Sequence, residues 1–214
     1  MALRSARPYI VSILLSALIL AFFPSHVEAG NGVTIPPLHE FIRTVRNGEV
    51  DSLRGVYVPQ VLASPIVSQP EDDPSFVSGQ ENTLTLFGQA ARVGSTGLLA
   101  HNYLAGRYFT KVGEQQVFYL VYGDGHTEAF VVTQILRFRA LEPDNIWSRF
   151  IDLSHGEIIS ASDLFSEVYA QPGRVVLQTC IRAGGESSWG RLFILAEPMV
   201  VKSIATDLPL DGKR

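Results

Sequence analysis

The sequence is poor in cysteine and has no basic run or stripe. Cys180 is the single cysteine among 214 residues, and the net charge is −4. One cysteine cannot form a disulfide within the chain, so this thiol is buried and inert, paired with another chain, or reactive. Nucleic acid is not expected as the main partner, because its phosphates call for clustered Lys and Arg.

The patterns of metal and nucleotide sites are also missing. No cluster of His, Cys, Asp or Glu has the spacing of metal ligands. The acidic run at 71–73 lacks the spacing of a calcium-binding loop and is interpreted as a solvated loop. The glycines at 123 and 125 lack the third glycine and the strand–helix context of a dinucleotide site. The sequence therefore predicts neither a metal nor a cofactor.

The first 29 residues differ from the rest of the chain. Two arginines precede an apolar run at 9–23. A run of about 15 residues suits the core of a signal peptide, whereas a full membrane span needs about 20. Val27 and Ala29 fit the small-residue positions before a signal-peptidase cut. We expect 1–29 to be a signal peptide or a retained N-terminal membrane anchor, and the protein to be exported in either case.

Short apolar and β-branched runs, the pattern of strands, fill most of the remaining chain. Helical spacing occurs near 38–45, before Asn47-Gly48, and after a capping box at 160–163. A Gly-Asp-Gly turn at 123–125 makes the strands on its two sides a hairpin. The predicted strands lie at 56–62, 66–67, 83–87, 97–100, 117–122, 129–138, 174–181 and 191–196.

These elements predict a mostly β fold, a closed barrel of seven or eight strands with one or two short peripheral helices. Strands and helices do not alternate as in βαβ units, which favours antiparallel pairing. Residues 140–160 are interpreted as loop-like, and 182–190 as a polar, Gly-rich loop. Along the chain we expect four parts, namely the signal or anchor at 1–29, a linker and short helix at 30–49, the main domain at 50–206 and a flexible tail at 207–214.

The surroundings of the lone cysteine favour reactivity. Exported proteins usually pair their cysteines or have none. Cys180 ends one apolar run, Arg191 opens the next, and a hairpin joining them would bring the two residues together. With a period of two, Gln178 shares the face of Cys180. Of five histidines, only His101 closes a strand-like apolar run, and a strand end is a rigid place for a catalytic base.

Three motifs resemble those of sortases. The sequence has Ala-His-Asn at 100–102, Leu-Gln-Thr-Cys at 177–180 and Gly-Arg-Leu-Phe-Ile-Leu at 190–195. Sortases carry a histidine after a strand, then an apolar strand ending in Thr-Leu-x-Thr-Cys, then an arginine that opens the next strand. The order, spacing and strand contexts are similar over about 50–206, which the resemblance makes a sortase-like barrel and catalytic domain. It implies catalytic roles for Cys180, His101 and Arg191, and substrate contacts for Thr179, Asn102 and Gln178.

The resemblance also implies a reaction and its partners. The Cys180 thiolate would cleave a sorting motif similar to Leu-Pro-x-Thr-Gly between Thr and Gly, and an amine would resolve the thioacyl-enzyme. His101 would serve as acid and base, and Arg191 would donate hydrogen bonds to the substrate backbone and the oxyanion. The partners would be surface proteins bearing a C-terminal sorting motif and an amine acceptor, such as a cell-wall precursor peptide or a pilin lysine. The protein would work at the outer face of the cell membrane or as a secreted enzyme.

The match to sortases is incomplete. Asn102 stands where many sortases have Arg, and Gln178 where Thr or Ile is common. Ser95-Thr96-Gly97 replaces the Pro-Gly that often precedes the histidine strand. These differences indicate a divergent subgroup and concern substrate preference more than chemistry. Two alternatives stay open, a cysteine peptidase that hydrolyses without transfer and an inactive sortase-fold surface or interaction module.

Overall fold

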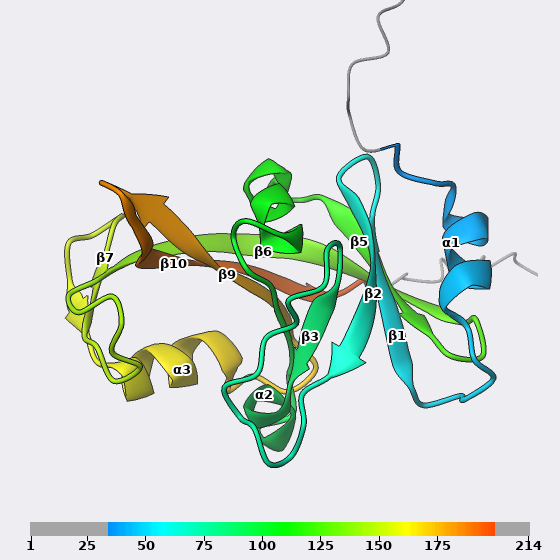
Figure 1. The fold of residues 1–214 in the computed structure, drawn as a ribbon, viewed down its shortest axis with the longest axis horizontal. Helices are drawn as coiled ribbons and strands as arrows, with labels where there is room; N and C mark the ends of the chain where they lie inside the picture. Colours follow the sequence, from blue (N-terminus) through cyan, green and yellow to red (C-terminus); the bar gives the residue numbers. More distant parts are fainter. Residues whose placement is uncertain (1–33, 200–214) are drawn as a thin grey trace, which may run out of the picture. The chain divides into compact units, whose positions relative to one another are not determined.

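A computed structural model describes residues 34–199 (Figure 1). The predicted signal or anchor at 1–29 and the predicted tail at 207–214 lie outside the described residues. The described helices are α1 (Leu38–Val45), α2 (Gly88–Arg92), the 3-10 helix η1 (Ala105–Lys111) and α3 (Ala161–Tyr169). The described strands are β1 (Leu53–Val58), β2 (Leu62–Ser68), β3 (Leu84–Phe87), β4 (Thr96–Leu99), β5 (Val117–Tyr122), β6 (Thr127–Ala140), β7 (Phe150–Asp152), β8 (Ile158–Ile159), β9 (Val175–Ala183) and β10 (Glu186–Pro198).

Eight of these strands close into a barrel. Neighbours follow the order β10-β9-β4-β3-β2-β1-β5-β6, and the pairing of β6 with β10 completes the ring. The two remaining strands, β7 and β8, extend the sheet outside the ring from β6. The predicted mostly β barrel is therefore confirmed. Pairing is mainly antiparallel, but β2 with β3 and β4 with β9 are parallel, because long crossover segments separate those strands in the chain.

The wall of the barrel is buried on both sides where β9 and β10 run. Leu177, Leu192 and Ile194 belong to the core that fills the barrel interior. Val176 and Phe193 point to the other side, where they join an apolar cluster that includes side chains of α3 and β7. Burial on both faces explains why these two strands appear in the sequence as nearly continuous apolar runs.

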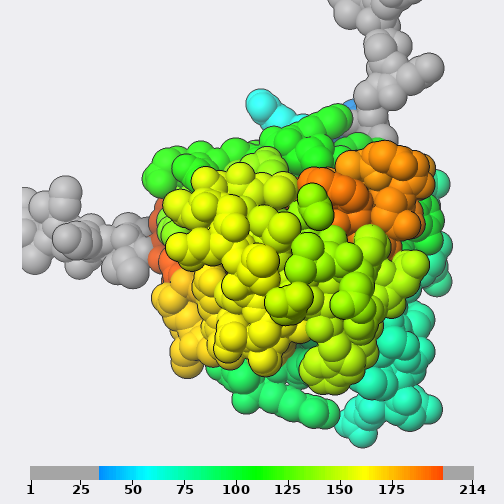
Figure 2. Space-filling model, turned by 90° about the vertical axis from the view of Figure 1, so that its left-hand side faces the viewer, coloured from blue at the N-terminus to red at the C-terminus, as the bar shows by residue number. Residues whose placement is uncertain are grey.

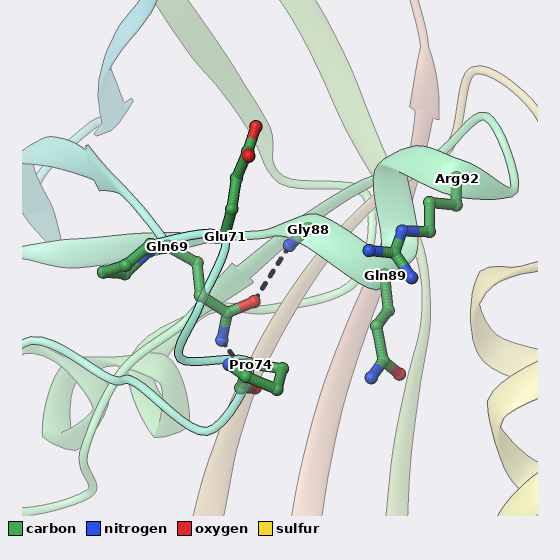
Figure 3. A pocket seen from close by; sticks show the side chains of 7 residues that line it. Gln69, Glu71, Pro74, Gly88, Gln89 and Arg92 are labelled. Carbon is green, nitrogen blue, oxygen red and sulfur yellow. Dashed lines mark hydrogen bonds between the residues drawn. The ribbon is translucent and has the colours of Figure 1, made fainter.

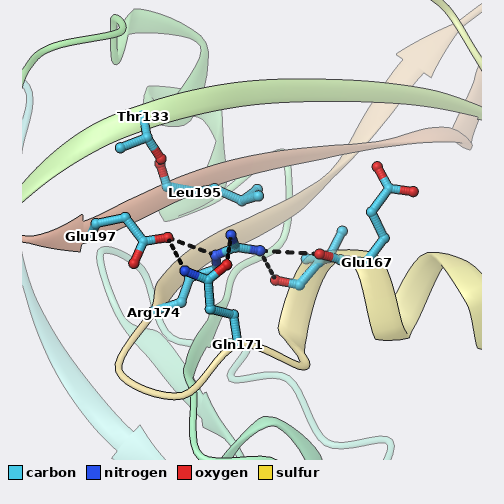
Figure 4. Close-up of polar contacts among 7 residues, drawn as sticks. Thr133, Glu167, Gln171, Arg174, Leu195 and Glu197 are labelled. Atoms are coloured by element: carbon cyan, nitrogen blue, oxygen red, sulfur yellow. Dashed lines mark hydrogen bonds and ion pairs between the residues drawn. The ribbon is translucent and has the colours of Figure 1, made fainter.

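Helix α3 packs on this outer cluster and is fixed at both ends. At its start, the Ser160 hydroxyl accepts a hydrogen bond from the Asp163 amide at 3.1 Å, as the capping box predicts. After its end, Arg174 donates through Nη1 to the Glu167 carbonyl and through Nε to the Glu197 carboxylate, both at 3.0 Å (Figure 4). A cation beside the last carbonyls also interacts favourably with the helix dipole. The Arg174 contacts therefore tie α3 to β10.

Helix α1 begins and ends where the sequence predicts. Its Phe41 and Val45 side chains are buried against β1 and β5. The rest of the helix surface is largely exposed, in agreement with a peripheral position. None of the helices among residues 34–199 has the length and apolar character needed to cross a membrane.

Two local predictions are wrong. The single strand expected at 56–62 is two strands, because the chain turns at Pro59-Gln60 between β1 and β2, and Gln60 has a left-handed φ of 63°. The segment 140–160 is not all loop, since it contains β7 and β8, which pair with each other and with β6.

A third prediction, the loop at 182–190, is also wrong. The connection at 182–190 is mostly strand, with a tight turn at Gly184-Gly185, where φ is 58° and 85°. Such positive φ values favour glycine. Helices α2 and η1 also have no clear signal in the sequence.

Helix η1 approaches β9 closely, and a glycine permits the approach. A Cβ atom on Gly106 would overlap the Thr179 hydroxyl and would lie 2.7 Å from the His101 carbonyl oxygen and 2.9 Å from that of Ala100. Real Cβ atoms essentially never make contacts this short. Glycine at position 106 therefore lets η1 form one side of the region around Cys180.

We predict that Gly106→Ala lowers the melting temperature. Overpacking of this kind costs about 1–3 kcal/mol, which corresponds to roughly 2–12 °C in a domain of this size. Thermal unfolding followed by circular dichroism measures the change. Gly113→Ala is the matched control, because nothing lies within 4 Å of a Cβ added there. Equal melting temperatures for Gly106→Ala and the wild type would contradict the close packing of η1 on β9.

Candidate active site

Cys180 and Arg191 lie opposite each other in the hairpin of β9 and β10. The antiparallel register pairs them directly. Both side chains therefore leave the same face of the sheet, the outer face that also carries Gln178 and Phe193. Both residues are half-buried, and Cys180 is a free cysteine. The pairing expected from the two apolar runs is thus observed.

His101 reaches the same end of β9 from the neighbouring strand. Strand β4 runs parallel to β9, with Leu99 opposite Gln178. The Ala100 amide extends this ladder by donating to the Gln178 carbonyl at 3.1 Å. When the same parallel register is continued two residues past Leu99 and Gln178, His101 lies level with Cys180. Two segments far apart in the sequence therefore end side by side, one with a histidine and one with the thiol.

Thr179 holds these two segments together. Its hydroxyl donates to the Ala100 carbonyl at 2.8 Å, and the residue is only 4% exposed. It faces the barrel side of the sheet, opposite Leu192, whereas Cys180 faces outward. In this structure the predicted substrate contact, Thr179, has its hydroxyl engaged with the segment that carries His101.

The guanidinium group of Arg191 is held by the hairpin itself. Its Nη1 donates to the carbonyls of Ser188 and Gly190, both at 3.0 Å. Its Cζ lies 5.8 Å from the centre of the Phe150 ring, within cation–π range. Among the described residues, Arg54 Nε is the one buried side-chain nitrogen or oxygen that lacks a hydrogen bond. Within residues 34–199, the Nε and Nη2 atoms of Arg191 have no hydrogen-bond partner, and neither is among the buried unpaired atoms.

Phe150 was missed by the sequence analysis, because it lies in the segment interpreted as loop-like. In the structure it is 6% exposed and belongs to the outer apolar cluster. Figure 2 shows the segment 141–160, in yellow-green and yellow, beside the orange β9–β10 hairpin. The β-branched and aromatic run at 150–151 is the only sequence signal for this strand, and it is short.

Asn102 connects the residue after the histidine to the tip of the hairpin. Its side-chain amide donates to the Ser187 carbonyl at 2.8 Å. Since Arg191 binds the adjacent Ser188 carbonyl, the loop after β4 and the arginine both fix the same turn. Asn102, predicted to contact substrate, thus has its amide N–H engaged with protein in this structure.

Gln178 is oriented by α3. Its side-chain oxygen accepts a hydrogen bond from the Tyr169 hydroxyl at 2.5 Å. Burial raises the pKa of Tyr169, so its hydroxyl keeps its proton and serves as the donor. The amide nitrogen of Gln178 has no hydrogen-bond partner among residues 34–199, and the half-buried side chain lies on the face that carries Cys180. Gln178 therefore presents a hydrogen-bond donor beside the thiol, and Tyr169 is a second residue that sequence reasoning missed.

A cleft of about 410 Å³ opens beside Cys180, between η1 and the second half of β9. Tyr103, Arg107 and Thr110 line one side, and Cys180 and Arg182 line the other. The thiol can therefore be approached along the edge of β9 as well as from the outer face. This open path and the free thiol fit a nucleophile that receives a large substrate.

Another hollow, between the loop at 69–76 and α2, lacks nucleophilic groups (Figure 3). Gln69 bridges it by accepting from the Gly88 amide at 3.1 Å and donating to the Pro74 carbonyl at 2.9 Å. Neither Cys nor His lines it, so it is not a candidate for cysteine chemistry. Within residues 34–199, no group of three or more His, Cys, Asp or Glu side chains is placed to hold a metal ion.

No protein-family model and no curated protein matches the chain. Solved structures with a similar fold include sortase C1 from Streptococcus suis, with 16% identity, 79% of this chain and 81% of that chain covered, and a TM-score of 0.46. For a complex of Streptococcus agalactiae sortase C1 with MTSET, the identity is 20% and the TM-score is 0.43. The match covers 73% of this chain and 74% of that chain. For sortase A from Corynebacterium diphtheriae, the identity is 15% and the TM-score is 0.47. The match covers 73% of this chain and 64% of that chain. These structures are all sortases, and at such identities and scores the chemistry has to be inferred from the chain's own residues.

Proposed function

We propose that the protein is a sortase-type cysteine transpeptidase. The observation that supports this most directly is the convergence on β9, where Arg191 is the cross-strand partner of Cys180 and the parallel register brings His101 level with the thiol. A nucleophile, an acid–base group and a donor for an oxyanion are the three parts that acyl transfer through a thioester needs.

The proposed reaction begins with cleavage of a C-terminal sorting motif similar to Leu-Pro-x-Thr-Gly. The Cys180 thiolate attacks the carbonyl carbon of the Thr–Gly bond, and a C–S bond forms. The C–N bond then breaks, and His101 gives its proton to the leaving amine. In the second half, an amine attacks the thioester, its proton passes to His101, and the thiolate leaves.

Arg191 is suited to the oxyanion of both tetrahedral intermediates. Because Nη1 is tied to two carbonyls of the hairpin, the guanidinium plane is fixed before substrate arrives. No group in the described part of the chain binds Nε or Nη2, which leaves both as donors toward the oxyanion. A preorganised donor stabilises developing negative charge without the cost of reorientation.

The proposed setting is the cell surface. The apolar run at 9–23 supports export through a signal peptide or a retained anchor. The proposed substrates are surface proteins with a C-terminal sorting motif, and the proposed acceptor is an amine such as that of a cell-wall precursor peptide or a pilin lysine. Hydrolysis without transfer and an inactive surface module are the outcomes that the following experiment separates.

We expect the purified protein to form a thioacyl adduct on Cys180 when it is incubated with a Leu-Pro-x-Thr-Gly-type peptide library and an amine. Intact-protein and peptide mass spectrometry detect the adduct, and the amine-linked product reports transfer. Cys180→Ala should give neither. Adduct and hydrolysed peptide without amine product would favour a peptidase, and no difference between wild type and Cys180→Ala would exclude the enzyme.

We predict that Arg191→Ala reduces the turnover of an active peptide about 10²–10³-fold, the usual loss for one oxyanion donor. Arg191→Lys should recover little, because an ammonium group cannot bind the hairpin carbonyls and the oxyanion in the same fork geometry. The measurement is single-turnover acylation of Cys180. Arg43→Ala, on the exposed side of α1, is the control. Turnover near the wild-type rate in Arg191→Ala would remove Arg191 from the site.

We predict that Asn102→Ala loosens the hairpin turn. The lost hydrogen bond is worth about 0.5–1.5 kcal/mol, so amide hydrogen exchange at 184–188 should rise roughly twofold to tenfold. Transfer should also fall, since Arg191 binds the same turn. Asn47→Ala removes the side-chain hydrogen bonds between Asn47 and Glu49 in another turn and should change neither. Unchanged exchange in Asn102→Ala would show that the bond to Ser187 does not hold the turn.

A further inference from the structure

The cleft beside η1 has a charge that the proposed reaction leaves unexplained. Arg107 and Arg182 both line it, and no Asp or Glu does. Arg107 is partly neutralised, because its Nη2 lies 3.1 Å from the Glu81 carboxylate and 2.8 Å from the Tyr108 hydroxyl. The side chain of Arg182 is exposed and makes no hydrogen bond or ion pair with any residue in the described part of the chain. The cleft therefore has an uncompensated positive charge next to the thiol.

The same cleft is bordered by an open strand edge. The Gln178 carbonyl points toward β4, where it accepts from the Ala100 amide. Because backbone groups alternate sides along a strand, those of Cys180 and Arg182 point the same way. Cys180 lies level with His101, so the open part of this edge begins beyond it, at Arg182. Helix η1 occupies that side without pairing to β9. A ligand with amide groups can thus hydrogen-bond to this edge, as peptides do when they add to a sheet.

The Cys180 thiol can be reached from the cleft and from the outer face of the sheet, and these two routes come from different directions. The outer face carries Gln178 and Arg191, whereas the cleft is also lined by Thr179, Ile181 and Leu192, which lie on the barrel side of the sheet. An acyl group on Cys180 can occupy the outer face while a second molecule enters along the edge. This arrangement is what a transfer reaction with two substrates requires.

We propose that this cleft is the binding site of the amine acceptor, and that the acceptor is a peptide-like molecule with a carboxylate close to its amine. The inference rests on the proposed transpeptidase function. The Arg182 side chain binds the carboxylate, and the backbone edge of β9 at Arg182 binds the amide groups. The nearby positive charge also lowers the pKa of an ammonium group, so it favours the neutral amine that attacks the thioester. In that step the C–N bond forms, the C–S bond breaks, and the amine proton passes to His101.

The test compares two matched acceptors, glycylglycine and glycylglycinamide, which differ in the carboxylate. The full-length protein is acylated with the Leu-Pro-x-Thr-Gly-type library, and mass spectrometry gives the ratio of amine product to hydrolysed product. This ratio cancels differences in the rate of acylation. The wild type should favour glycylglycine about fivefold, as expected for an ion pair with hydrogen bonds at an accessible site.

Variants locate the carboxylate site. Arg182→Gln should abolish the preference, Arg182→Lys should keep most of it, and Thr110→Glu, which puts a carboxylate into the cleft, should reverse it. Arg43→Gln, on α1, should keep the wild-type preference. Equal ratios for the two acceptors in the wild type, or a full preference in both Arg182→Gln and Thr110→Glu, would overturn the proposal.

The outcome separates this inference from the proposed function. A Cys180 adduct that transfers equally to both acceptors, or that is only hydrolysed, overturns the acceptor site and leaves a cysteine enzyme. The absence of any adduct overturns both.

Discussion

Strand β9 is bordered by two strands that stop at different places, and the candidate site depends on that difference. On one side β10 continues antiparallel to the hairpin turn, so Arg191 stands across from Cys180. On the other side the parallel partner β4 ends at Leu99, and the chain turns away after His101 into η1. The Thr179 hydroxyl joins these two segments by its bond to the Ala100 carbonyl. The Cys180 thiol therefore lies beside the end of β4, whereas β10 continues on the other side of β9.

The surrounding layers keep this junction in place. The barrel core fixes β9 from inside through buried aliphatic side chains, and the outer cluster beneath α3 and β7 fixes it from outside. The polar groups between these layers are mostly satisfied by backbone atoms, as for Arg191, or by a buried hydroxyl, as for Gln178. Hydrogen bonds at the edge of an apolar cluster are less screened than those in water. Side chains held in this way lose little freedom when a substrate binds.

The sequence predicted those parts of the site that depend on neighbouring segments. The pairing of Cys180 with Arg191 follows from two adjacent apolar runs and the two-residue period of strands. The place of His101 does not follow from any local rule, because a parallel pairing with β9 across a long crossover leaves no periodic signal. The place of His101 in the site was predicted instead from the resemblance to the sortase motifs. Phe150 and Tyr169 were not predicted, because their contacts depend on how the segment 141–170 packs on the barrel.

The close packing around Gly106 predicts how this position varies among related sequences. Two of the three atoms that would meet its Cβ are main-chain oxygens, those of Ala100 and His101. A smaller side chain at 179 would remove the overlap with the hydroxyl and leave these two. No compensating side-chain substitution can therefore make room for another residue at this position. In chains that share the junction of β4, η1 and β9, the glycine should stay fixed, so its absence would indicate that the histidine loop follows another path.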